Sequence, residues 1–186
     1  MSNPSVQSFS AVSAAVSPEQ VAELARQYGA LVYRAAYRLL GTRAAAQDVQ
    51  QDLFVRLLQQ PPSAVRSWPA YLTAATVRLS LNQLRRRRQW SKFVQFWSSG
   101  DTLNASSAEE EIAADETADR LRSALARLKP IEAQCFALRY LHSFEIAQVA
   151  ASVGITENYV SVCLHRAVKR LQELQLAPQF SSEIKS

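Results

Sequence analysis

The chain has 186 residues, enough for one domain or two small ones. Hydrophobic residues make up 48% and charged residues 20%, the balance of an ordinary folded protein. Only 4 glycines are present, which argues against turn-rich all-β folds and glycine-rich nucleotide loops. Without a long apolar run or a basic leader, neither a transmembrane helix nor a secretory signal is expected. Two cysteines are too few for a disulfide framework or a typical zinc site, so a cytoplasmic protein without a bound metal is expected.

Charge is unevenly distributed along the chain. The net charge is +5, from 21 basic and 16 acidic residues. Residues 61–100 hold 7 basic and no acidic side chains, whereas residues 101–120 hold 1 basic and 7 acidic ones. Residues 121–186 are basic again, with 8 basic and 5 acidic side chains. This order predicts a polyanion-binding protein built in two pieces.

Helix signals begin after residues 1–17, which are small and polar, have no period and are expected to be disordered. Ser17 is suited to cap a helix, and the proline after it is suited to the first helical position. Apolar residues then recur at three- and four-residue steps until Gly41, which can end a helix in the left-handed conformation. The pattern predicts one helix, or two broken near Gly29, over residues 18–40.

Two more helices are predicted before a linker. The first covers about residues 43–59 and ends at a pair of prolines; the second covers about 70–88, after a loop over 63–69. Residues 98–115 begin with a Ser-Ser-Gly-Asp cluster and are expected to be a flexible acidic linker. The core stripe of the first of these helices consists of Val49, Leu53 and Leu57.

The second piece, about residues 116–176, also has helical patterns, and the tail at 177–186 is expected to fray. No segment has the alternation of a strand, so the fold is predicted to be all-α. It would consist of two small helical domains, 18–97 and 116–176. The helical segments of the second domain are expected at 119–128, 131–141, 147–153 and 156–174.

The residues from Gln148 to Val160 have the spacing of a helix-turn-helix. Gly154 permits the positive φ of the turn, and Thr156 can cap the helix that follows. On a helical wheel Val160 lies on the core face, and a polar face lies opposite. That face carries groups suited to DNA bases and phosphates, although an ordinary solvated face would have the same pattern. Its members are Asn158, Val162, His165, Arg166 and Lys169.

Two other patterns suggest contact surfaces. Four arginines, Arg85–Arg88, are followed by aromatic residues, which is typical of a nucleic-acid surface, a membrane-surface helix or a solvated helix end. Asp48, Gln51, Asp52 and Val55 share a face that is separate from the core stripe. The carboxylates are expected to be exposed, which by itself indicates only a solvated surface. Cys135 and Cys163 are expected to be buried, and core packing is favoured over redox sensing.

Taken together, the chain resembles the extracytoplasmic-function sigma factors of the bacterial sigma-70 family, over about residues 20–97 and 116–174. The segment 43–57 is similar to region 2.1–2.2, which in that family docks on the clamp helices of the largest polymerase subunit. The resemblance implies that this protein binds core RNA polymerase and promoter DNA, has an anti-sigma factor as partner, needs no cofactor, and is not an enzyme. The implied polymerase-binding residues are Asp48, Gln51, Asp52 and Phe54.

Residues 68–88 are similar to regions 2.3–2.4, which open and read the −10 element. Arg78 stands where an Asn is usual in the family, and Asn82 where an Asp is usual. The implied contacts with the −10 element are Trp68, Tyr71, Arg78, Asn82, Arg85 and Arg86.

The stretch from Leu164 to Leu171 is similar to the end of the family's recognition helix, which reads the −35 element. Ser-Val-Cys replaces the usual Lys/Arg-Ser-Arg at 161–163, so two cations are absent from the reading face and an unusual −35 sequence is expected. The implied contacts with the −35 element are Thr156, Asn158, Ser161, Val162, His165, Arg166, Lys169 and Arg170.

Two readings from other classes remain open at the level of sequence. The protein could be a helix-turn-helix repressor or activator that acts without polymerase, with residues 18–97 as a sensing or dimerisation domain. It could also be a membrane-surface or RNA-binding adaptor that uses the arginine run, without stable insertion into a membrane. An enzyme is disfavoured because His142 and His165 are the only histidines, and no carboxylate cluster accompanies them.

Overall fold

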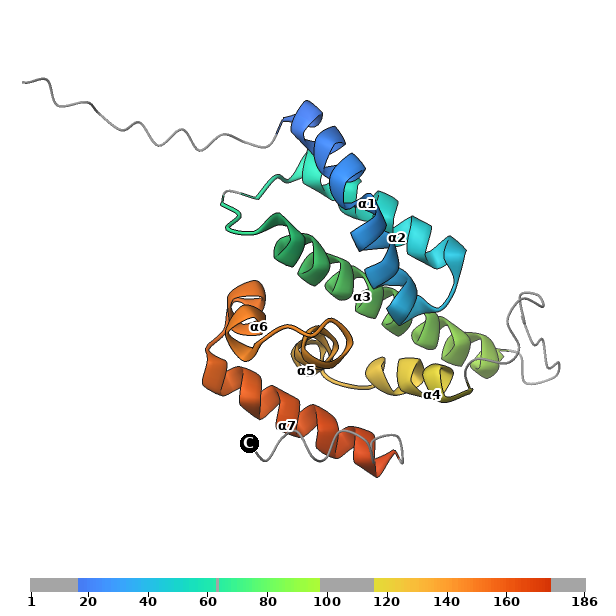
Figure 1. Ribbon diagram of the computed structural model, residues 1–186. Helices are drawn as coiled ribbons and strands as arrows, with labels where there is room; N and C mark the ends of the chain where they lie inside the picture. The colour runs from blue at the N-terminus through green and yellow to red at the C-terminus, as the bar shows by residue number, and fades with distance from the viewer. Residues whose placement is uncertain (1–16, 63, 98–115, 175–186) are drawn as a thin grey trace, which may run out of the picture.

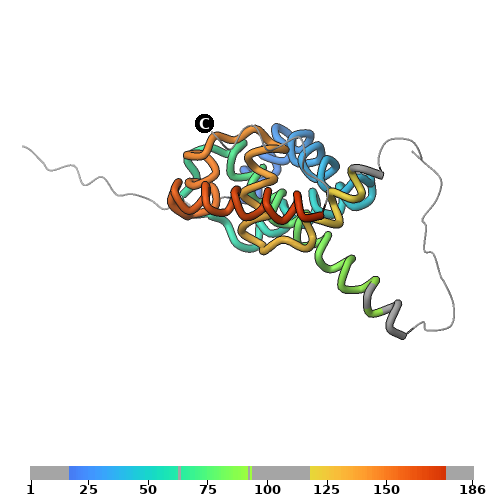
Figure 2. Tube along the Cα trace, turned by 90° about the horizontal axis from the view of Figure 1, so that it is seen from below, coloured from blue at the N-terminus to red at the C-terminus, as the bar shows by residue number. Residues whose placement is uncertain are grey.

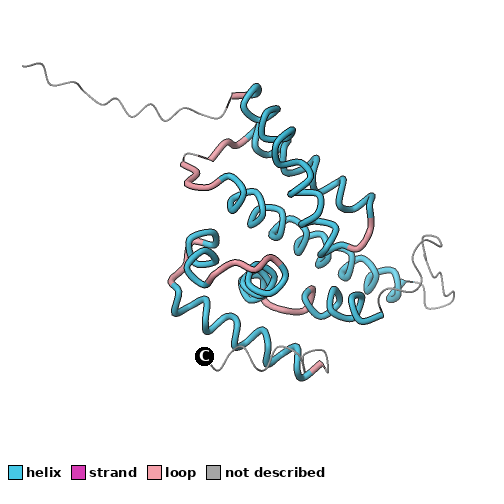
Figure 3. The backbone as a smooth tube through the Cα atoms, in the orientation of Figure 1, coloured by secondary structure: helices cyan, strands magenta, loops and turns pink. Residues whose placement is uncertain are grey.

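The computed structural model describes residues 17–62, 64–97 and 116–174, and within these ranges every regular element is a helix (Figure 3). Three predicted segments lie outside the described residues: the N-terminal segment up to residue 16, the linker at 98–115 and the tail at 177–186. None of the helices described is long and apolar enough to cross a membrane. In chain order the elements are α1 (Pro18–Leu40), α2 (Arg43–Gln59), α3 (Trp68–Trp97), α4 (Glu116–Leu125), α5 (Pro130–Phe136), the π-helical turn η1 (Ala137–Leu141), α6 (Ile146–Val153) and α7 (Glu157–Glu173).

Helix α1 begins and ends where the sequence indicates. Ser17 and Gln20 cap its start reciprocally, and Gly41 ends it with φ 75°. Of the two alternatives for residues 18–40, the single helix is confirmed, because α1 is continuous through Gly29. The carbonyl of Gly29 accepts a hydrogen bond from Nε2 of Gln50 at 3.0 Å, and a Cβ at Gly29 would lie 3.1 Å from the same nitrogen. The glycine therefore allows α2 to approach closely and does not interrupt the helix.

The bounds of α2 agree with the prediction, and its stripe of Val49, Leu53 and Leu57 is buried. Helix α3 is longer than expected. It begins at Trp68, inside the predicted loop, and continues nine residues beyond Arg88. Arginine, glutamine and lysine are good helix formers, and no glycine or proline interrupts the chain before Gly100. The arginine run therefore lies within the helix and not at its end.

The second half differs from the prediction in two segments. The helix expected over 119–128 is α4, which begins and ends three residues earlier. The helix expected over 131–141 is divided into α5 and the π-helical turn η1, after which Ser143 has φ 56°. The helix-turn-helix is confirmed: α6 ends at Gly154, whose φ is 76°, and the hydroxyl of Thr156 accepts a hydrogen bond from the amide of Tyr159 at 3.3 Å.

The two halves pack against each other through α3. Helices α1 and α2 contact α3 on one side, and α4, α5, η1 and α6 contact it on the other (Figures 1 and 2). The buried hydrophobic residues of both halves form one continuous cluster. A flexible linker between independent domains does not by itself predict this contact, because it depends on residues far apart in the sequence.

Polar side chains join the halves at the C-terminal end of α1. The guanidinium of Arg38 donates a hydrogen bond to the carbonyl of Leu141, at the end of η1. Arg122 of α4 covers Gly41, where a Cβ would lie 2.5 Å from its Cζ atom. Burial, and secondly the charge of Arg38, lower the pKa of His142 to about 4, so this imidazole is neutral at physiological pH.

Both cysteines are buried, as predicted, on the facing helices α5 and α7. Burial raises the pKa of the Cys135 thiol to about 12, and burial also raises the pKa of Cys163. Because the thiolate is the reactive form, two thiols in this environment react slowly at neutral pH. The burial of both side chains agrees with a role in packing the core.

Glu132 is a buried carboxylate beneath α7. Its side chain is 1% exposed, and its Oε2 lies 3.3 Å from Nη1 of Arg170, whose side chain is 43% exposed. The geometry is that of an ion pair without an aligned hydrogen bond. Since a buried charge is costly without a partner, Arg170 has a structural task in holding α7 on α5.

We expect Arg170→Ala to lower the free energy of unfolding by about 2 kcal/mol, because it leaves the Glu132 carboxylate buried and unpaired. The neighbouring cation Lys169 is exposed, so Lys169→Ala should change it by less than about 0.5 kcal/mol. Urea denaturation of both variants measures the difference; equal stabilities would contradict the structural role of Arg170.

Stability should also fall in mild acid. The pKa of His142 is lower in the folded chain, about 4, than its ordinary value of 6.5, so the unfolded chain binds the proton more readily between these two values. The free energy of unfolding should therefore drop by about 2 kcal/mol from this group as the pH falls from 7 to 4.5. Urea denaturation across this range should show a smaller drop for His142→Gln than for the wild type.

Candidate functional site

The exposed face of α2 carries three of the four residues that were expected to bind polymerase. Asp48 and Gln51 are exposed and Asp52 is half-exposed, all clear of the buried stripe. Phe54 is different, because it is half-buried and packs against the core. The structure therefore brings the two carboxylates and the amide together on one surface and places Phe54 at its side, between Gln51 and the buried stripe.

The same face of α2 has an apolar part. Val55 is 47% exposed and Leu58 is 49% exposed. At about 100° per residue, both lie within about 80° of Asp48 on the helix. Leu58 was not among the predicted site residues, although an apolar side chain on a polar face is a signal that could have found it. We call Asp48, Gln51, Asp52, Val55 and Leu58 the α2 surface; it can bind a partner that is both basic and apolar.

A groove between α2 and α3 joins the α2 surface to the predicted DNA contacts. A cavity of about 260 Å³ is lined by Asp48 and Asp52 on α2 and by Asn82 and Arg86 on α3. Arg56 lines it too, with its Nε 2.8 Å from Oδ1 of Asp52. A second cavity, of about 180 Å³, follows along the same two helices and includes Tyr71 and Arg78. The sequence did not predict this adjacency.

The predicted −10 contacts on α3 differ in accessibility. Arg78, Asn82 and Arg86 are exposed. Arg85 is half-buried, and burial lowers its pKa; Nη1 donates to Oδ1 of Asn82 at 3.2 Å, while Nε and Nη2 are enclosed without a hydrogen-bond partner. A guanidinium with two enclosed donors can bind an anion only if its surroundings rearrange.

The predicted stacking residues Trp68 and Tyr71 are both half-buried. Their rings pack edge to face with centroids 5.9 Å apart, and both contact the core. Two other rings are more accessible: Trp90 is 67% exposed and Phe93 is 52% exposed, with centroids 5.7 Å apart. They lie on the C-terminal part of α3, which extends beyond the other helices (Figure 2). Sequence reasoning noted them next to the arginines but did not include them in the site.

Helix α7 lies on the outer side of the second half, away from α3 (Figure 1). Thr156 is engaged as its N-cap, Val162 is half-buried, and Arg170 is paired with Glu132. The remaining predicted contacts form an exposed row with hydroxyl, amide, imidazole and cationic groups, which can meet base edges and phosphates in a major groove. They are Asn158, Ser161, His165, Arg166 and Lys169.

Two family models match the chain. The model described as "Sigma-70 region 2" matches residues 24–90, and the one described as "Sigma-70, region 4" matches residues 124–173. The first match contains the α2 surface and the groove, and the second contains the helix-turn-helix.

Two relatives with similar sequences are RNA polymerase sigma factors. The probable ECF RNA polymerase sigma factor SigI of Mycobacterium tuberculosis is 27% identical over 82% of this chain, which spans 54% of that protein's length. The ECF RNA polymerase sigma factor SigL of the same species is 30% identical over 78% of this chain and 83% of SigL.

The sigma factor RpoE of Bartonella quintana, crystallised with the anti-sigma factor NepR, has a similar fold. Its TM-score is 0.51 at 18% identity, covering 84% of this chain and 97% of that one. At this identity the likeness concerns the fold alone, and it agrees with an all-α chain that ends in a helix-turn-helix. Together with the two region models and the identity to SigL, these features show that the chain belongs to the ECF family of RNA polymerase sigma factors.

Proposed function

We propose that this protein is a sigma factor that binds core RNA polymerase through the α2 surface, opens the −10 element with α3 and reads the −35 element with α7. The observation that carries the proposal is the adjacency of the α2 surface and the exposed α3 residues in one groove, with a separate helix-turn-helix in the second half. In this role residues 18–97 and 116–176 act as two domains joined by residues 98–115. It acts by binding and not by catalysis, and it acts where the polymerase is, in the cytoplasm.

An anti-sigma factor is proposed as a further partner. Support comes from the RpoE structure, in which a sigma factor of similar fold is bound to NepR.

A repressor that acts without polymerase is not favoured. That function would not explain the match to sigma-70 region 2 or the exposed α2 surface.

Run-off transcription with purified core polymerase on a pool of genomic DNA fragments, followed by mapping of the start sites, tests the proposal. A sigma factor should give start sites that core polymerase alone does not give, and should bind the same DNA only weakly without polymerase. Tight binding without polymerase, together with unchanged start sites, would favour a repressor.

Charge reversal on the α2 surface should weaken polymerase binding. We expect Asp48→Arg to lower the affinity for core polymerase at least about tenfold, since like charges at an interface cost several kcal/mol. Because Asp48 is exposed, the variant should keep the fold of the wild type. Glu23→Arg on α1 is the matched control, as Glu23 is also exposed and makes only a local ion pair with Arg26. A pull-down with core polymerase that treats both variants alike would refute the assignment.

Arg86 and Arg87 are adjacent exposed arginines, and Arg86 alone of the two lines the groove. Arg86→Ala should therefore reduce melting of the −10 element, while Arg87→Ala should reduce it less, because both lose one charge but only the first loses it at the proposed DNA path. Permanganate footprinting of polymerase complexes measures the unpaired thymines. Equal melting by both variants would place the DNA elsewhere on α3.

On α7 we expect two kinds of contact. Arg166→Ala should change the preferred base at one −35 position, with a loss of about 1–3 kcal/mol at the preferred sequence. Lys169→Ala should weaken all sequences alike and reduce the salt dependence of binding. Transcription from a randomised −35 library at two salt concentrations separates the two effects. If neither variant alters preference or salt dependence, α7 does not face the DNA as proposed.

A further inference from the structure

The first turns of α7 carry no cationic side chain. In a helix-turn-helix, the N-terminal residues of the second helix contact the base edges in the major groove. Every residue of α7 is described, and its lysine and arginines, Arg166, Lys169 and Arg170, all lie in its C-terminal half. Since a bidentate arginine or a lysine makes the commonest specific contact with guanine, the N-terminal half of α7 lacks the usual means of selecting that base.

Two apolar side chains take up part of the accessible surface of these turns. Tyr159 is 42% exposed, and Val162 is half-buried. At about 100° per residue, Val162 lies within about 60° of Tyr159 around the helix, and Arg166 lies within about 40° of Val162. We call Tyr159 and Val162 the apolar patch; it borders the exposed row of predicted contacts, and Tyr159 was not among the residues expected there.

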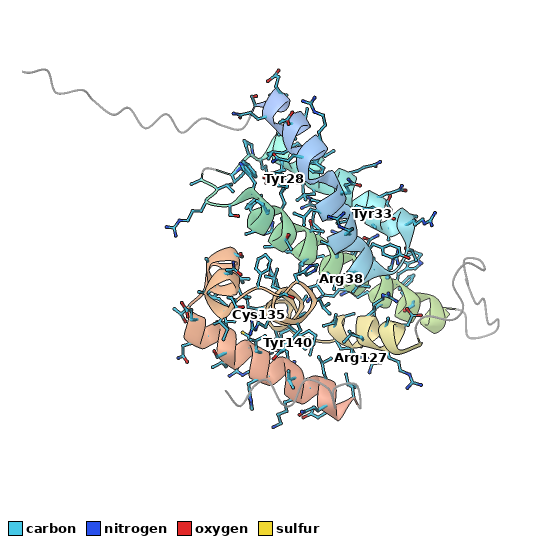
Figure 4. The ribbon with its side chains drawn as sticks, in the orientation of Figure 1. Tyr28, Tyr33, Arg38, Arg127, Cys135 and Tyr140 are labelled. Atoms are coloured by element: carbon cyan, nitrogen blue, oxygen red, sulfur yellow. The ribbon has the colours of Figure 1, made fainter. Side chains whose placement is uncertain are left out.

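The Tyr159 ring is restrained by the next turn of the helix. Burial raises the pKa of the Cys163 thiol, and the Tyr159 hydroxyl is near enough to oppose that rise. The ring therefore lies along the flank of α7. Cys135 of α5 lies on the inner side of α7, whereas the side chains of the outer face point away from the rest of the molecule (Figure 4). A restrained ring loses little conformational freedom when it binds a ligand.

We propose that the apolar patch recognises a thymine of the −35 element through the 5-methyl group of that base. This inference rests on the proposed function, because it requires α7 to enter the major groove of a promoter. Among the groups that base pairs present in the major groove, the thymine methyl is the apolar one, and an apolar side chain can contact it without leaving a polar atom unpaired.

The length of the patch fits separate contacts along the DNA. From Tyr159 to Arg166 the helix rises about 10 Å, at about 1.5 Å per residue. Successive bases of one strand are about 3.4 Å apart along the duplex, so this rise spans about three base steps. The thymine and the base or phosphate that meets Arg166 therefore belong to different base pairs, and the two contacts do not compete.

The first experiment removes only the methyl group. Core polymerase and the wild-type chain transcribe a promoter fragment found by start-site mapping, in which each thymine of the −35 region, on either strand, is replaced in turn by deoxyuridine. At least one replacement should lower run-off transcription at limiting protein about fourfold, the effect of burying one methyl group. The inference is overturned if no replacement has an effect, or if the −35 region contains no thymine.

The second experiment asks which side chain meets the methyl group. In Tyr159→Ala, the critical replacement should change transcription less than about 1.5-fold, because the apolar contact is already lost. Tyr159→Phe keeps the ring and should keep the fourfold effect. Val162→Ala should reduce the effect in part. If Tyr159→Ala responds to deoxyuridine as the wild type does, another residue reads the thymine and the inference is wrong.

Lys169→Ala is the matched control on the same helix. It should lower transcription from every fragment, because it removes a phosphate contact, but it should retain the difference between thymine and deoxyuridine. Loss of that difference in Lys169→Ala as well as in Tyr159→Ala would show that the difference depends on overall affinity and not on the apolar patch.

The wild-type experiment also separates this inference from the proposed function. Start sites that require the protein but do not respond to deoxyuridine would overturn only the reading of the methyl group. The absence of protein-dependent start sites would overturn the proposed function, and the inference with it. Because Tyr159 is exposed, Tyr159→Ala should unfold at the same urea concentration as the wild type, so lost methyl dependence would not reflect lost folding.

Discussion

The burial of α3 on both of its sides is the constraint on which the rest of the structure depends. Between Leu72 and Leu84 its side chains are apolar or small at nearly every position, and only Arg78 and Asn82 are exposed. One layer of helices can cover only one side of such a helix, and apolar area left in water costs about 25 cal/mol per Å². The first half covers one side with α1 and α2, and the second half covers the other with α4, α5 and α6.

This arrangement leaves a narrow polar strip on α3 directly beside α2, and that is where the candidate contacts gather. The acidic and apolar residues of the α2 surface lie across one groove from Asn82 and Arg86. In a sigma factor this adjacency would place strand opening next to the polymerase. In the second half, caps at the starts of α6 and α7 and the buried Glu132 under Arg170 support α7, whose outer face is exposed.

The shared core joins the two halves through buried hydrophobic residues, with polar contacts at its edge. Contact with the second half buries the side of α3 that α1 and α2 leave uncovered. At the edge of this core the exposed Arg38 guanidinium donates to the Leu141 carbonyl, and Arg122, whose side chain is 23% exposed, covers Gly41. Separating the halves would expose apolar surface of α3 as well as break these polar contacts, so the shared core is the larger part of what holds them together.

The sequence by itself determined the helices, the helix-turn-helix and the exposed row on α7, because capping residues, glycines and the 3.6-residue period act locally. Ser17, Gly41, Gly154 and Thr156 each have the predicted role. It did not determine the role of Gly29, the burial of Arg85 or the pairing of Arg170, since each depends on a side chain from another element. Only the tertiary structure decided that the two halves share a core around α3 and meet at Arg38, because both depend on contacts between elements distant in the chain, 103 residues apart for Arg38 and Leu141.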